Sequence, residues 1–203
     1  MENTLIIIGA VVFFGIITIK RFKLINLLKK MLNKQLPIPS YLKGILVPIK
    51  SKSSENCVQG GLKCQCGNMG EFELLYSGNL KKDVIKKIKD EDFLVFAKCL
   101  KCGSKMLIFN DAVHGWDGVV CHADKKSESL PIDLKTWKCF QCQSESQKIS
   151  IAISSQGKED FISEAGPDFN PELWIEAFDW ITIDTKCNKC GSEVKELVSF
   201  ETM

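Results

Sequence analysis

Four closely spaced cysteine pairs constrain this chain more than any other feature. The pairs are Cys64/Cys66, Cys99/Cys102, Cys139/Cys142 and Cys187/Cys190. In three of them a glycine follows the second cysteine, which favours a tight turn that directs two sulfurs and several backbone N–H groups to one point. Two such turns complete a tetrahedral site of four thiolates. The spacing therefore predicts two structural Zn²⁺ ions, held by eight of the ten cysteines.

The first and third pairs depart from the pattern of the other two. Cys64 and Cys66 are separated by a single residue, so Cys57 stays open as an alternative partner for Cys66. Gln143 stands where the other pairs have glycine, and the left-handed backbone expected there costs more for a residue with a side chain. Four thiolates also bind iron, but zinc is our prediction for a cytoplasmic site of this kind.

Between the cysteine pairs, the chain repeats one order of predicted elements. Each copy runs cysteine turn, strand, short helix, strand, cysteine turn, strand. The first copy has predicted strands at 71–77, 93–97 and 106–109 and a predicted helix at 79–92. The second has predicted strands at 148–154, 180–184 and 194–200. There, Asn170 before Pro171 is a favourable helix start, and 155–170 is predicted to be a long acidic loop.

This order resembles the zinc ribbon, in which two cysteine turns meet at one end of a small antiparallel sheet. The resemblance covers roughly residues 57–110 and 136–203 and implies a small, metal-bound, mainly β fold with short helices. It implies no single function, because zinc ribbons serve in transcription, translation, enzymes and adaptors. The expected domains are a transmembrane plus basic juxtamembrane helix (1–36), a linker (37–56), ribbon 1 (57–110), a connecting segment (111–135) and ribbon 2 (136–203).

The start of the chain predicts a membrane anchor. Residues 4–19 carry no charge, and Lys20, Arg21 and Lys23 follow directly. Sixteen helical residues span about 24 Å, and snorkelling of the flanking basic side chains extends their reach toward the ~30 Å hydrocarbon core. Since basic residues favour the cytoplasmic side, we expect a single-pass helix in the cell (inner) membrane, with its N terminus outside and the later chain in the cytoplasm. A buried or interfacial helix is the alternative.

Charge is distributed unevenly along the chain. The stretch 20–54 carries nine Lys/Arg residues and no acid, whereas 55–203 carries 18 Lys against 24 Asp/Glu. The globular part is therefore anionic, which argues against a phosphate backbone as its partner. The amphipathic basic segment 21–36 fits either an anionic membrane surface or a protein surface.

Residues 111–122 hold the remaining candidates for chemistry. They include Asp117, Cys121 and both histidines of the chain, His114 and His122. One interpretation is a catalytic Cys/His pair or a third metal site. We favour the other, a glycine-rich connection with a strand at 119–121. On a strand Cys121 and His122 would point to opposite faces, and we expect Cys121 to be buried or unreactive.

The sequence as a whole favours binding over catalysis. It contains no glycine-rich phosphate loop and no HExxH or GxSxG motif, and we assign no catalytic residue. We expect a membrane-anchored cytoplasmic zinc-ribbon protein that acts as a protein-binding adaptor or regulator, with a protein partner still to be identified. The alternatives are a nucleic-acid or translation-associated ribbon, and a hydrolase-type enzyme that uses residues 111–122.

Overall fold

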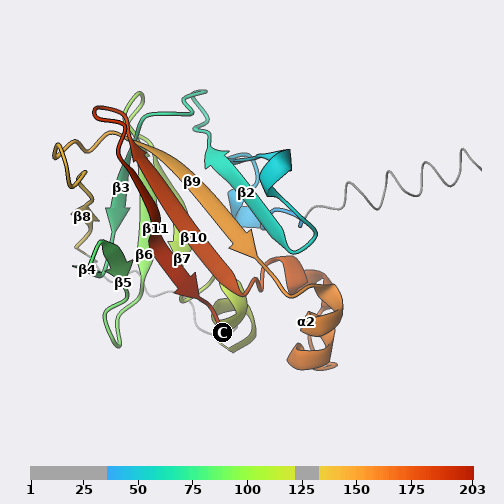
Figure 1. Cartoon of the computed structure of the whole chain (residues 1–203). Helices are drawn as coiled ribbons and strands as arrows, with labels where there is room; N and C mark the ends of the chain where they lie inside the picture. The colour runs from blue at the N-terminus through green and yellow to red at the C-terminus, as the bar shows by residue number, and fades with distance from the viewer. Residues whose placement is uncertain (1–35, 122–132) are drawn as a thin grey trace, which may run out of the picture. The chain divides into compact units, whose positions relative to one another are not determined.

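The computed structural model describes residues 36–121 and 133–203, which form a small, mainly β domain (Figure 1). The strands are β1 (Leu46–Pro48), β2 (Cys57–Leu62), β3 (Phe72–Tyr76), β4 (Asn79–Lys81), β5 (Val84–Lys86), β6 (Leu94–Cys99), β7 (Lys105–Asn110), β8 (Lys135–Thr136), β9 (Gln147–Ser154), β10 (Trp180–Cys187) and β11 (Glu193–Glu201). The helices are α2 (Lys158–Ala165), the 3₁₀ turns η1 (Ser40–Leu42), η2 (Lys50–Lys52) and η4 (Pro171–Ile175), and the π-helical turn η3 (Asp117–Cys121).

Several predictions about the first 36 residues fall outside this description. The predicted membrane helix at 4–19 and all but the last residue of the basic segment 21–36 are among the residues not described, as is His122. Within 36–121 and 133–203, no helix is long and apolar enough to cross a membrane.

Alternation of apolar and polar residues produces the long strands. In β9 every second residue is buried, and Ile149, Ile151 and Ile153 line the inner face. β10 pairs with β9 along its whole length and buries Ile181 and Ile183 on the same side. Period-two burial of branched side chains is the pattern of a strand with one face on the core. The strands predicted around 71–77, 93–97, 106–109, 148–154, 180–184 and 194–200 are confirmed.

One sheet contains both sequence copies. Its strand order is β4-β5-β11-β10-β9-β3-β6-β7, while β2 lies between β9 and β1, and β8 pairs with β3. β9 makes the connection, because it pairs with β2 of the first copy from Cys57 to Gly61 and touches β3 at Phe72. The cysteine turns of the two copies therefore belong to one continuous hydrogen-bonded structure.

Aromatic side chains join the two halves of the core. The ring of Phe200 in β11 lies 5.4 Å from Phe93 and 5.1 Å from Phe109, measured between centroids. Phe109 also contacts Phe178, whose side chain is fully buried. Each such ring removes some 150–250 Å² from water, so this cluster contributes much of the packing energy away from the cysteines.

The prediction of a helix at 79–92 is wrong. The chain there forms the β4–β5 hairpin, with Lys82 and Asp83 at its tip in the left-handed conformation (φ 46° and 65°). A two-residue turn of that hand matches the twist of a hairpin. Ile85 is buried because β5 adds to the edge of β11, so tertiary pairing overrides the helical spacing of the apolar residues.

Two further local predictions are corrected by the structure. Residues 119–121 form part of η3 instead of a strand, and Gly118 packs against the backbone of Val113 so closely that a Cβ would lie 2.4 Å from it. The acidic segment 155–170 is not all loop, since it contains α2. The helix start at Asn170 is confirmed in a shorter form, because its side chain accepts a hydrogen bond from the Glu172 N–H at the start of η4.

The segment expected to act as a linker belongs to the core. Leu42 and Leu46 are buried, and β1 pairs with β2. The approach is close at Gly60, where a Cβ would lie 2.4 Å from the Val47 carbonyl oxygen. Prolines and serines in this stretch therefore shape a packed segment that covers one side of β2.

Candidate metal centres

The structure gathers eight cysteines into two groups of four. Group 1 is Cys64, Cys66, Cys99 and Cys102, and group 2 is Cys139, Cys142, Cys187 and Cys190; within each group the sulfurs lie within 4.8 Å of one another. Their closest contacts are 3.5 and 3.7 Å in group 1 and 3.6 and 3.5 Å in group 2. A tetrahedron with metal–sulfur bonds of about 2.3 Å places its sulfurs about 3.8 Å apart. Both groups therefore fit one metal ion each.

Three of the four cysteine turns share one backbone geometry. The N–H of Cys99, Cys139 and Cys187 each donates to the carbonyl five residues later, at 2.8–2.9 Å. The N–H four residues after each of these cysteines donates back to the cysteine carbonyl at 2.8–3.0 Å. This pair of hydrogen bonds closes each turn and brings the two sulfurs of the pair to the same side of it.

The shorter first turn reaches the same result with one residue fewer. The Cys64 N–H donates to the Asn68 carbonyl and the Gly67 N–H to the Cys64 carbonyl, both at 2.8 Å. Cys64 is one of the two buried members of group 1, while Cys57 lies in β2 outside both groups. The residue after the second cysteine is left-handed in all four turns, with φ of 87°, 76°, 56° and 77° at Gly67, Gly103, Gln143 and Gly191.

Polar side chains support the sulfurs of group 1. The Asn68 amide donates to the Cys99 Sγ at 3.2 Å, and the Ser104 hydroxyl lies 3.2 Å from the Cys64 Sγ and 3.1 Å from the Cys102 Sγ. Burial opposes ionisation of Cys99, but the Asn68 amide and two backbone N–H groups outweigh it and lower its pKa to about 6. The sequence analysis missed Asn68 and Ser104; both stand two residues after a cysteine pair, which is the available signal.

Group 2 relies on backbone donors. Burial opposes ionisation of Cys187, yet the N–H groups of Cys190 and Lys189 lower its pKa to about 6. Among the described residues, no side-chain N–H or O–H donates to a sulfur of this group. The buried Gln147 instead supports the turn itself, since its amide donates to the Ser144 carbonyl at 2.8 Å.

Each group also contains a thiol that resists ionisation. The Asn68 N–H favours the Cys66 thiolate, but desolvation and the three neighbouring sulfurs prevail and raise its pKa to about 11. In the same way, the Ser192 N–H favours the Cys190 thiolate, but desolvation and the neighbouring sulfurs prevail and raise its pKa to about 12. Four thiolates so close together repel one another unless a cation lies between them. The donor set thus matches a divalent metal and would be electrostatically unfavourable if fully ionised without one.

The two groups lie at the same end of the sheet. Asn188, in the last cysteine turn, donates through its side-chain amide to the Gly70 carbonyl at 2.8 Å and to the Ser146 hydroxyl at 2.9 Å. Gly70 follows the first cysteine turn, so this amide spans both groups. In Figure 1 the β10–β11 turn and the β2–β3 connection are seen together at the upper end of the sheet. We call this the metal end.

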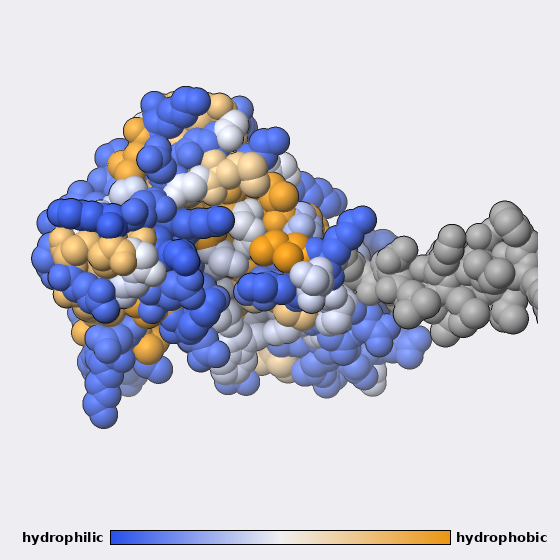
Figure 2. All heavy atoms as spheres, turned by 45° about the horizontal axis from the view of Figure 1, so that its top comes forward, coloured by the Kyte–Doolittle hydropathy of each residue, from blue (hydrophilic) through white to orange (hydrophobic). Residues whose placement is uncertain are grey.

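Large apolar side chains are exposed on the metal end. Leu100 and Phe140 each follow the first cysteine of a pair and are 43% and 40% exposed, and Met69, two residues after Gly67, is 47% exposed. Figure 2 turns this end toward the viewer and shows hydrophobic residues among hydrophilic ones. The cysteine turns thus hold apolar side chains outward on a fixed framework.

His114 is part of the core. Its ring stacks on Tyr41 with centroids 3.6 Å apart, and its Nδ1 accepts a hydrogen bond from the Asn110 N–H at 3.1 Å. Burial lowers its pKa to about 4, so the ring is neutral near pH 7. A partly buried, neutral, hydrogen-bonded histidine has a packing role, and no metal group in the described ranges includes it.

Cys121 is exposed, so of the two predicted alternatives, a buried or an unreactive thiol, the structure excludes the first. Burial of its sulfur, a hydrogen bond with Asp117 and the negative charge of that carboxylate all raise its pKa. A raised pKa keeps the thiol protonated and poorly nucleophilic, as the expectation of low reactivity requires.

No protein-family model matches the chain, and no curated protein or solved structure is significantly similar to it. The two groups of four cysteines are compatible with a zinc-ribbon-like fold.

Proposed function

We propose that this chain is a membrane-anchored zinc protein whose metal end binds another protein as an adaptor or regulator. One observation carries the proposal: exposed apolar side chains stand on the cysteine turns, whose backbones are closed by hydrogen bonds. Leu100 and Phe140 are both next to buried metal-ligating cysteines. Exposed apolar clusters with a polar surround are typical of protein-binding surfaces, and a rigid support reduces the entropy lost on binding.

Zinc is the metal that we assign to both groups. Eight thiolates in two sets of four match its preference for closed tetrahedral sulfur sites. When bound, each ion would offset half of the charge of its four thiolates and would stabilise the folded domain. The protein itself positions the sulfurs through its cysteine turns. In group 1, Asn68 and Ser104 also stabilise the negative charge of the sulfurs.

The membrane part of the proposal rests on the sequence. An uncharged run at 4–19 followed by Lys20, Arg21 and Lys23 supports an anchor with its N terminus outside and the metal end in the cytoplasm, where reduced cysteines persist. A reporter that works only in the cytoplasm, fused after Met203, should be active. Activity of an extracytoplasmic reporter at that position would contradict the topology.

The binding role is tested by removing the exposed apolar groups. Full-length protein carrying both Leu100→Ser and Phe140→Ser should lose most of the cross-linked partners recovered from solubilised membranes, while its zinc content stays at two per chain. Ile162→Ser in α2 is the matched control, because Ile162 is 44% exposed but lies away from the cysteine turns. Recovery of the same partners by the double variant would refute the proposal.

A further inference from the structure

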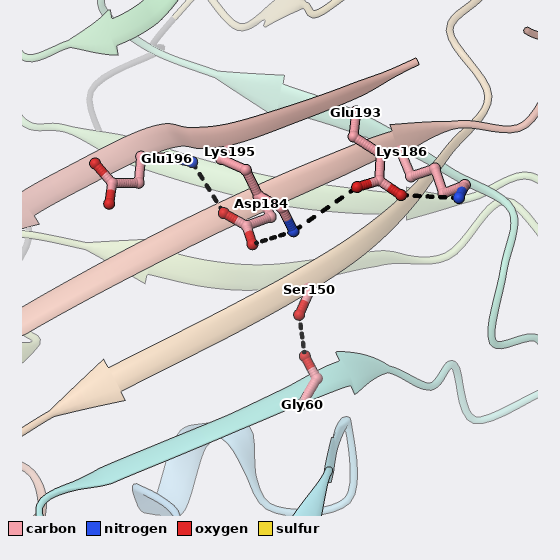
Figure 3. Close-up of polar contacts among 7 residues, drawn as sticks. All are labelled: Gly60, Ser150, Asp184, Lys186, Glu193, Lys195 and Glu196. Carbon is pink, nitrogen blue, oxygen red and sulfur yellow. Dashed lines mark hydrogen bonds and ion pairs between the residues drawn. The ribbon is translucent and has the colours of Figure 1, made fainter. Parts of the chain in front are cut away.

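A charged groove runs over the outer face of β9, β10 and β11, next to the metal end. Its volume is about 270 Å³, and its charged lining consists of Lys52, Lys148, Lys186, Lys195, Asp184 and Glu193. Four lysines against two carboxylates make this site positive on a domain that is otherwise anionic. We call it the lysine groove; Figure 3 shows most of its polar contacts.

An irregularity in β11 creates one wall of the lysine groove. The β10–β11 register shifts between Ile183 and Thr185, and Glu196 is left-handed at φ 53°. The Asp184 carboxylate fills the bulge, since it accepts hydrogen bonds from the Glu196 N–H at 2.9 Å and the Lys195 ammonium at 3.2 Å (Figure 3). A bulge re-aims side chains relative to a regular strand, and here it holds Lys195 over the groove.

Both carboxylates of the groove already have partners. Asp184 is occupied by the bulge and Lys195, and Glu193 pairs across the strands with Lys186 at 2.8 Å (Figure 3). The Lys186 ammonium lowers the pKa of Glu193, with smaller contributions from Lys195 and Lys52, which reflects the positive potential of the site. Neither Lys52 nor Lys148 has an ion-pair partner within residues 36–121 and 133–203. These two charges are available for a ligand.

Glycine leaves the floor of the groove open. Gly61 in β2 lines it, and a Cβ at this position would meet no atom within 4 Å. Its φ is not in the left-handed region, unlike that of eight other glycines, so a residue with a side chain fits this backbone without strain. The neighbouring Ser150 hydroxyl is turned away to the Gly60 carbonyl at 3.1 Å. The apolar side chain of Ile49, 39% exposed, contributes another part of the lining.

We propose that the lysine groove binds an acidic, extended peptide segment of a partner protein, with two carboxylates on Lys52 and Lys148 and an apolar side chain against Ile49. This deepens the proposed function, on which it rests, by giving the partner a chemistry. Charge complementarity selects the occupant, because the available groups are cationic. A nucleic acid fits less well, since it carries a charged phosphate at every nucleotide, whereas the groove offers only two lysines without an ion-pair partner among the described residues.

The test uses the full-length, zinc-loaded protein in nonionic detergent. The probe is a nine-residue peptide in which glutamate alternates with threonine around one isoleucine, labelled with an uncharged dye and followed by fluorescence anisotropy. The comparison probes are its glutamine counterpart and a single-stranded RNA of equal charge. We expect saturable binding of the acidic peptide alone.

Three variants separate charge, shape and background. Lys52→Gln with Lys148→Gln should weaken peptide binding about tenfold, the scale expected for two exposed ion pairs. Gly61→Val should abolish it by filling the groove without removing a charge, and its melting temperature should stay near that of the parent. Lys43→Gln with Lys81→Gln removes two exposed lysines outside the groove and should change nothing.

Clear outcomes would overturn the groove proposal. Equal binding of the glutamine peptide, unchanged binding by a folded Gly61→Val, or tighter binding of the RNA would each do so. The proposed function fails separately. If the peptide does not bind but Leu100→Ser with Phe140→Ser still abolishes partner cross-linking, the adaptor function stands and the groove assignment falls. If the peptide binds while those two substitutions leave cross-linking intact, the groove assignment stands and the proposed role of the metal end falls.

Discussion

Group 1 and group 2 hold their sulfurs at nearly the same separations with different supporting residues. Group 1 combines a shortened turn, glycine at both left-handed positions and side-chain donors from Asn68 and Ser104. Group 2 has two full-length turns, a strained Gln143 and donors from the backbone. The difference shows that the sulfur geometry is fixed by the turns, whereas the stabilisation of thiolate charge is supplied locally and differs between the groups.

Removing a buried cysteine should have the largest effect in either group. Cys99→Ser and Cys187→Ser should each reduce the metal content from two ions to one, because a closed site does not tolerate the loss of a ligand. Structural zinc contributes about 10–16 kcal/mol of binding free energy in small domains, so both variants should also melt far below the parent. Elemental analysis and thermal unfolding of the full-length chain measure this.

Cys57→Ser and Cys121→Ser are the matched controls for that experiment. Both cysteines lie outside the groups, so these variants should keep two ions and the parental melting temperature. If Cys57→Ser lost an ion and Cys64→Ser kept both, the fourth ligand of group 1 would be Cys57 instead of Cys64.

Removing the side-chain donor should affect group 1 alone. Asn68→Ala leaves the Cys99 sulfur without its amide donor, and partners of this kind commonly change metal affinity by about 10–100-fold. Asn188→Ala is the counterpart in group 2, where the amide bonds to Gly70 and Ser146 instead of a sulfur. Competition with a chromophoric chelator should show a weakened site in the first variant. Equal losses in both variants would contradict the local supply of charge stabilisation.

The same substitution should shift acid release of the metal. The pKa of Cys99 is lowered from 9.0 to about 6, so the stabilisation from its thiolate is complete above about pH 9 and is lost as the pH falls through about 6. Without the Asn68 amide the pKa rises, and group 1 should release its ion at a higher pH than in the parent. A zinc-responsive dye followed from pH 8 to pH 5 should record this shift, with the group 2 step unmoved.

Exchanging the left-handed residues should give the smallest effect. Gln143→Gly relieves a left-handed conformation that costs about 1–2 kcal/mol for a residue with Cβ. Two effects reduce this gain in stability: glycine makes the unfolded chain more flexible, and the hydrogen bond from Gln143 Nε2 to the Cys139 carbonyl is lost. We expect a net gain of about 0.5 kcal/mol, and a loss of about 1 kcal/mol for Gly103→Gln. Denaturant unfolding with zinc in excess measures both, and a gain from Gly103→Gln would contradict the shared geometry.

The sequence predicted the parts of the structure that depend on short-range chemistry. Cysteine spacing identified both groups, glycine after the cysteines anticipated the left-handed turns, and alternation located the long strands. It failed at 79–92, because the apolar spacing of a helix also suits a hairpin whose Ile85 fills a position against β11. The sequence signal of Asn68 and Ser104 is limited to their place two residues after a cysteine pair, because their contacts with the sulfurs depend on chain reversals that spacing alone does not specify.

The pairing of β9 with both β2 and β3 has a thermodynamic consequence. Because both groups lie at one end of the same sheet, an ion bound in either group would shift the folding equilibrium of the strands that carry the other. The first ion to bind therefore meets the conformational cost of ordering both sites, and the second finds its ligands already in place. Linkage of this kind is reciprocal. Two chemically separate sites that share a folding unit should then bind cooperatively, so that an ion in one group raises the metal affinity of the other, while each group still releases its ion at a pH set by its own ligands.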